Sequence, residues 1–125
     1  MLTFDQFKYG WANALDQDEA KQIYDEFHVP GSGKVLFQGG FANANPASEL
    51  KVDTKNPDRG PMLLISGEAD HTVPWAIVNA SYGKQKRNPG VTEIKKIANR
   101  GHALTIDNGW GAVAGTALEF VQRFT

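Results

Sequence analysis

Residues 62–74, Met-Leu-Leu-Ile-Ser-Gly-Glu-Ala-Asp-His-Thr-Val-Pro, join an apolar run to a polar turn, and this change of character decides the fold. The run Met62–Ile65 follows a proline and stops before Gly67, which is typical of a strand buried on both faces of a parallel sheet. Asp70 comes three residues after that glycine, so we expect it on a turn just past the carboxyl end of the strand. Pro74 suits the first turn of the helix that follows.

A second strand is predicted over residues 91–97, and a histidine follows it in a similar place. This residue is His102, in the sequence Arg-Gly-His, and a C-terminal helix is predicted over residues 108–124. Strand, helix, strand and helix together form a right-handed parallel unit. Asp70 and His102 both follow the carboxyl ends of neighbouring parallel strands, so we expect them to lie close together. Ligands bind at these strand ends in such a sheet.

The order apolar strand, Ser-Gly-x-x-Asp-x-x-Val-Pro, helix, strand, Gly-His and terminal helix resembles the last third of the α/β-hydrolase fold. On this resemblance Asp70 matches the acid of the catalytic triad and His102 matches its histidine. Residues 1–50 resemble a helical lid inserted ahead of these strands, residues 51–60 form a connector, and residues 61–125 are the α/β part. The implied fold class is α/β, with a short parallel sheet, flanking helices and a preceding lid-like segment.

The nucleophile of that family is missing from the sequence. Its serine stands in a Gly-x-Ser-x-Gly motif on a sharp strand-to-helix turn, and none of Ser32, Ser48, Ser66 and Ser81 has glycines at that spacing on both sides. The early strands and the oxyanion-hole loop of the family are absent as well. We therefore interpret the chain as the C-terminal half of a hydrolase.

The resemblance assigns complementary roles to the acid and the histidine. Asp70 would accept the Nδ1 proton of His102, which leaves Nε2 free to act as general base on a hydroxyl. Taken singly, Asp70 could cap a turn or helix and His102 could be a loop residue, but their joint order favours the pair. His71 is a poor candidate for the base, because consecutive side chains on a turn diverge. The three histidines lack metal-ligand spacing, so we expect no metal and no cofactor.

The first half of the chain reads as helical. Thr3 and Asp16 are candidate N-caps for two helices that carry apolar and aromatic stripes, while the segment after Gly33 could form a helix or a strand. We name Trp11, in the lid-like segment, and Trp75, at the mouth of the expected site, as candidate substrate contacts. Ordinary packing is the alternative for both tryptophans.

Composition narrows the functional classes. The chain has 125 residues, 41% of them hydrophobic and 22% charged, as in a folded globular domain. A formal net charge of -1 gives no electrostatic footprint for nucleic acid or for an anionic membrane. The absence of cysteine fits a reducing compartment, and no apolar run approaches the roughly 20 residues of a membrane span, so we predict a cytoplasmic location.

Two functional hypotheses follow. In the first, the chain is a truncated or split esterase-like hydrolase that supplies Asp70 and His102 but no nucleophile, and is inactive alone. In the second, it is a noncatalytic binding or assembly module on the same scaffold. The expected partners are an ester-like small molecule and either a second copy or the complementing N-terminal half, because two parallel strands leave an apolar edge unpaired. Alternatively, the helices of residues 1–50 fold back and seal that edge.

Overall fold

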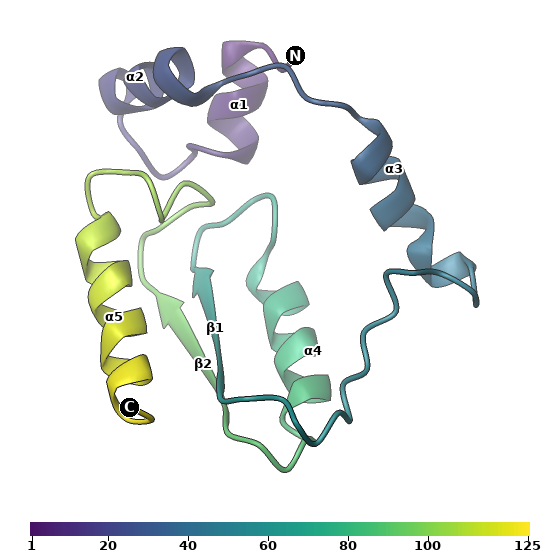
Figure 1. The fold of residues 1–125 in the computed structure, drawn as a ribbon. Helices are drawn as coiled ribbons and strands as arrows, with labels where there is room; N and C mark the ends of the chain where they lie inside the picture. The colour runs from purple at the N-terminus through teal and green to yellow at the C-terminus, as the bar shows by residue number, and fades with distance from the viewer.

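The computed structural model describes residues 1–125, except for the side chain of residue 43. The fold is mixed α/β: helices make up the first half of the chain, and strands and helices alternate in the second half (Figure 1). The elements are α1 (Phe4–Gly10), α2 (Gln17–Phe27), α3 (Lys34–Phe41), the 3-10 turn η1 (Ala42–Ala44), β1 (Met62–Gly67), α4 (Trp75–Gln85), β2 (Thr92–Ile97) and α5 (Trp110–Gln122). Among the residues described, no helix combines the length and the apolar character needed to cross a membrane.

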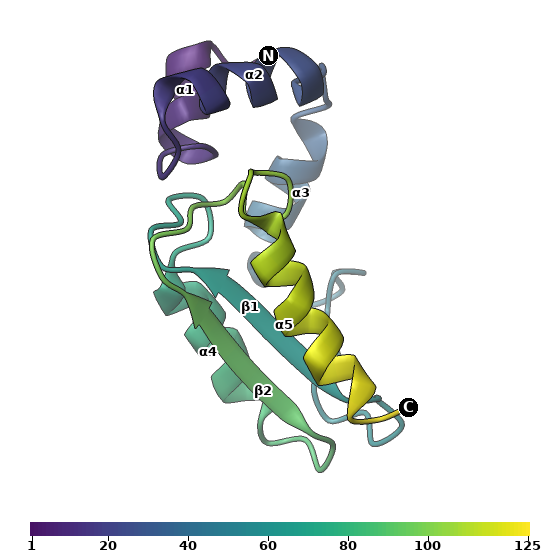
Figure 2. The same ribbon diagram turned by 90° about the vertical axis from the view of Figure 1, so that its left-hand side faces the viewer.

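The predicted strand–helix–strand–helix unit is confirmed. β1 and β2 pair in parallel, in a register that runs from Met62 opposite Thr92 to Gly67 opposite Ile97. Helix α4 crosses over on one face of this sheet and α5 lies along the other face (Figure 2). The carboxyl ends of both strands therefore lie at the same end of the sheet, and the turns that follow them lie side by side.

The expectation that β1 is buried on both faces is wrong for most of the strand. Met62–Ile65 are half-buried, and burial is complete only at Ser66 and Gly67. The reason lies in the size of the sheet, since β2 is the only strand that pairs with β1 among the residues described. The other edge of β1 has no strand to shield it.

Helices α1 and α2 form a small apolar unit of their own. The Thr3 hydroxyl accepts the Gln6 N–H at 3.3 Å while the Gln6 side chain accepts the Thr3 N–H at 2.9 Å, a capping box that starts α1. The Asp16 carboxylate accepts the Glu19 N–H at 2.8 Å and starts α2. Both predicted caps are thus confirmed. The residues packed between the two helices are Phe7, Ala12, Ala20 and Ile23, with Phe4, Leu15 and Tyr24 around them.

The segment after Gly33, for which the sequence allowed either a helix or a strand, is the helix α3. Its large apolar side chains, Val35, Leu36, Phe37 and Phe41, are exposed. Figure 1 shows α3 standing apart from the sheet, and the chain then runs through turns, without a regular element, until β1.

The helices of residues 1–50 do not seal the edge of the sheet. Figures 1 and 2 show α1 and α2 over the carboxyl ends of β1 and β2, where the turns emerge. This placement covers the candidate site and leaves the outer edge of β1 without a partner strand from the residues described.

Candidate functional site

The two turns that carry Asp70 and His102 are joined backbone to backbone. Past the end of β1, the Glu68 N–H donates to the Ile97 carbonyl and the Ala69 N–H donates to the Arg100 carbonyl, both at 2.9 Å. Gly67 permits this approach, because a Cβ there would stand 2.6 Å from the Gly101 carbonyl oxygen. The parallel pairing therefore continues beyond the strands and fixes the distance between the turns.

Asp70 uses both of its carboxylate oxygens. Oδ1 accepts the N–H groups of Thr72 and Val73, each at 2.8 Å, and Oδ2 lies 2.9 Å from Nδ1 of His102. The Asp70 side chain is only 5% exposed. Its two roles in the sequence analysis, turn former and partner of the histidine, are both fulfilled, one by each oxygen.

His102 is held on one side and open on the other. A carboxylate only accepts hydrogen bonds, so the contact with Asp70 places the ring proton on Nδ1 and leaves the lone pair on Nε2. The His102 side chain is 23% exposed, and the Trp11 ring meets it edge-on with centroids 4.3 Å apart. The structure brings together three of the four predicted site residues.

The segment after α1 is bound to both turns. On the acid turn, the carbonyl of Tyr9 lies 2.9 Å from Nδ1 of His71, and the Thr72 hydroxyl donates to the Gly10 carbonyl. On the histidine turn, the Ala103 N–H donates to the carbonyl of Trp11 at 3.0 Å. His71 thus points toward α1 and takes no part in the Asp70 contact, as the divergence of neighbouring side chains predicts.

Two further side chains anchor the region of α1 and α2. Nδ2 of Asn13 donates to the Ala69 carbonyl at 2.7 Å, and Oε1 of Glu19 accepts the Asn108 N–H at 2.6 Å. Asn13 touches the acid turn while Glu19 touches the segment that leads into α5. The segment is therefore fixed to the loop after each strand.

A buried ion pair, which the sequence did not predict, joins two residues on either side of His102 in the sequence. The Arg100 guanidinium contacts Oδ1 of Asp107, whose side chain is fully buried, and the same oxygen accepts the Gly109 N–H at 3.0 Å. Oδ2 of Asp107 is buried with no hydrogen-bond partner among the residues described. The available signal was an arginine and an aspartate on either side of the histidine, seven positions apart.

Trp75, the fourth predicted site residue, contacts a different side chain, that of Lys96. It is the first residue of α4, and its ring stacks under the ammonium of Lys96 at 4.8 Å from the ring centroid. In the part of the chain that the structure describes, no group of three or more His, Asp and Glu residues could hold a metal ion.

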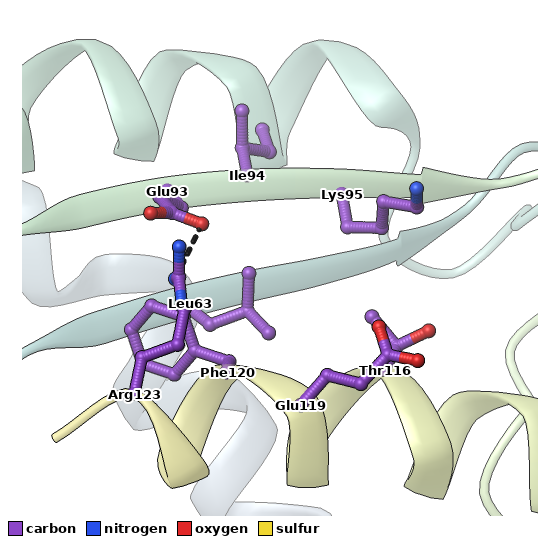
Figure 3. Close-up of a pocket in the computed structure, with 8 residues that line it drawn as sticks. All are labelled: Leu63, Glu93, Ile94, Lys95, Thr116, Glu119, Phe120 and Arg123. Carbon is purple, nitrogen blue, oxygen red and sulfur yellow. Dashed lines mark ion pairs between the residues drawn. The ribbon is translucent and has the colours of Figure 1, made fainter.

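Two cavities lie at different places in the fold. A cavity of about 610 Å³ is lined by residues of α1, α2, α3 and the segments beside them, Trp11 among them. A smaller one, about 260 Å³, lies between the sheet and α5, along the first half of the strands. Figure 3 shows Leu63 and Phe120 pointing into this smaller gap, beside the ion pair between Arg123 and Glu93 at 2.8 Å. Trp11, the neighbour of His102, lines the larger cavity, whereas Asp70 and His102 are not among the residues that line either cavity.

Comparisons with known proteins identified no family: no family model, no curated protein and no solved structure matches this chain.

Proposed function

We propose that this chain is the C-terminal part of an esterase-like α/β-hydrolase that provides the acid and the histidine of a catalytic triad. The observation that carries the proposal is the 2.9 Å contact between Oδ2 of Asp70 and Nδ1 of His102, at the carboxyl ends of two parallel strands. An acid and a histidine so placed, in this chain order, suit the hydrolase triad. The parent reaction is hydrolysis of an ester or of a related acyl or carbon–halogen bond.

The chemistry of an ester then runs through Nε2 of His102. A serine hydroxyl attacks the ester carbonyl and passes its proton to Nε2, while Asp70 stabilises the imidazolium. The imidazolium protonates the departing alcohol, and a water molecule, activated in the same way, releases the acid and the serine. General acid–base catalysis of this kind contributes about 10² to 10⁴ in rate.

The nucleophile comes from a segment that is not among these 125 residues. Ser66, the serine nearest in sequence to Asp70, is buried, and its hydroxyl donates to the Gly67 carbonyl. The Thr72 hydroxyl donates to the Gly10 carbonyl. Since these two hydroxyls near Asp70 are already engaged, we expect the chain alone to be inactive.

The outer edge of β1 is where the missing part would join. Its backbone groups face no other strand among the residues described, and an unpaired edge is a template for another strand. A strand added there would run beside β1 and end near Asp70 and His102. We therefore propose a complementing N-terminal hydrolase half, or a second copy of the chain, as the partner on this edge.

The test measures turnover of a chromogenic short-chain ester. The purified chain alone should give none, whereas the chain coexpressed with an N-terminal hydrolase half that carries the nucleophile elbow should give turnover. In that complex His102→Ala should abolish the activity, while His71→Ala, which removes the neighbouring imidazole, should keep most of it. Turnover by the chain alone that survives His102→Ala would refute the proposal, as would a complex that is indifferent to His102→Ala.

The noncatalytic alternative rests on a separate observation. Helix α3 exposes Val35, Leu36 and Phe37, each at 69% or more, and exposed apolar side chains gathered on one element mark interaction surfaces. In this alternative the chain is an assembly module that associates through α3. Sedimentation at micromolar concentrations separates the two, because Phe37→Asp would dissociate an α3-mediated complex and leave one formed through β1 intact.

A further inference from the structure

We propose that helix α3 is a site of limited proteolysis. An endoprotease that accepts an aromatic side chain before the bond it cuts hydrolyses the peptide bond between Phe37 and Gln38, in the middle of α3. Water adds across this bond, so that Phe37 gains a carboxylate and Gln38 gains an amine. The cut separates the segment that carries α1 and α2 from the α/β part. The inference is independent of the proposed function, since it involves neither Asp70 nor His102.

Helix α3 is accessible along its whole length. All of residues 29–41 are exposed, and α3 stands apart from the sheet in Figure 1, with η1, the turn that continues it, as its neighbour. Leu36 lines the larger cavity but is 79% exposed, so this contact leaves the helix uncovered. Among the described residues, no ion pair or hydrogen bond joins residues 29–52 to another part of the chain. The segment can therefore unfold locally without breaking polar contacts elsewhere.

The sequence of α3 makes it a weak helix. It has eight residues, and isolated helices shorter than roughly 12–15 residues are marginal in water. Its N-cap, Gly33, supplies no side-chain cap, and the helix has no acidic residue in its first turn and no basic residue in its last. Gly39 and Gly40 weaken it further, because glycine loses more conformational freedom than alanine when a helix forms.

The weakness of the helix matters because a protease binds its substrate as an extended chain. The rate of cutting then follows the population of the locally unfolded form. The residues beside the bond also suit such an enzyme. Val35 and Leu36 place apolar side chains before Phe37, and Gly39 and Gly40 beyond Gln38 let the two backbones approach closely.

Exposure alone does not define this site. Tyr9 is 70% exposed and Phe37 is 69% exposed, so the two aromatic side chains are equally accessible. Tyr9, however, lies in α1, which has a capping box and buries Phe7, and its carbonyl lies 2.9 Å from Nδ1 of His71. Cutting after Tyr9 would first require these contacts to break. We therefore expect the bond after Phe37 to be cut faster by at least about tenfold.

The experiment treats the full chain with a trace of chymotrypsin, which cuts after aromatic residues, and identifies the products by mass spectrometry. The first cut should fall within α3. The double variant Gly39→Ala/Gly40→Ala, in which each added Cβ meets no atom within 4 Å, should slow this cut by about 5- to 30-fold, because alanine stabilises the helix. The matched control is Gly111→Ala/Gly115→Ala in α5. These glycines also face open space, and their replacement should leave the rate of the α3 cut unchanged.

A second protease separates the opening of the helix from the fit of the new alanines in the enzyme. Thermolysin cuts before large apolar residues, and its cut within α3 should be slowed by a similar factor in the Gly39→Ala/Gly40→Ala variant, because both enzymes need the same unfolded form. Slowing of chymotrypsin alone would show an effect on enzyme fit and would overturn the helix argument.

Four further results would overturn the inference. These are resistance of the whole chain to both proteases, a first chymotrypsin cut outside α3, equal slowing by the two glycine pairs, and a cut whose first-order rate constant falls as the protein concentration rises while staying below KM. Equal slowing would mean that cutting requires global unfolding. A fall with concentration would mean that a second copy covers α3.

Discussion

Removing one partner of the Arg100–Asp107 pair should be the most damaging single-charge change in this chain. The Asp107 side chain has no solvent exposure and that of Arg100 has 19%. In the Asp107→Ala variant the guanidinium would remain largely buried without its carboxylate, and the Gly109 N–H would lose its acceptor. Breaking a buried pair in this way costs about 3–5 kcal/mol.

A loss of that size is a large share of the total stability, which is about 5–15 kcal/mol for a typical domain. For a chain of this length it corresponds to a fall in Tm of roughly 10–20 °C. Thermal unfolding followed by circular dichroism measures the fall. The physical reason is the desolvated charge left behind, so an exposed pair should behave differently.

The Lys21–Asp25 pair on α2 provides the matched control. Its side chains are 53% and 59% exposed, and such pairs contribute about 0.2–1 kcal/mol. Asp25→Ala should therefore lower Tm by only a few degrees. Equal falls for Asp107→Ala and Asp25→Ala would refute the argument that burial makes the Arg100 charge dependent on Asp107.

Three further changes test the site and its supports. In Asp70→Asn, the amide oxygen should keep the hydrogen bonds from the two backbone N–H groups, so the amide NH₂ faces His102. The ring proton of His102 should then move from Nδ1 to Nε2, which the imidazole nitrogen chemical shifts measure. An unchanged tautomer would contradict this. Gly67→Ala forces a Cβ against the carbonyl oxygens of the next turn and should cost about 1–3 kcal/mol in urea unfolding. Its control, Gly83→Ala in α4, has open space and should stabilise by about 0.5–1 kcal/mol, so a loss at both sites would contradict the steric argument. Thr3→Ala removes the cap of α1 and should cost about 1 kcal/mol, and no change in unfolding free energy would show that the cap contributes nothing.

The sequence by itself determined the features that depend on near neighbours. The caps at Thr3 and Asp16 need only an oxygen three residues before a free N–H, and the composition of the segments around them supplies that. The apolar run before Gly67 predicted β1, and the chain order then predicted that Asp70 and His102 would meet, because a crossover returns the second strand to the same edge.

The tertiary structure decided everything that depends on which segments pack together. Trp11 became the neighbour of His102 through the docking of the segment after α1, and no local pattern specifies that contact. The buried pairing of Asp107 with Arg100 likewise emerges only from the folded loop between β2 and α5. The half-burial of β1 follows from the number of strands beside it, a property of the assembled sheet and not of the strand's own residues. Short-range hydrogen bonds and periodicity depend on residues close together in the sequence. Contacts between distant turns form only when the fold brings those turns together.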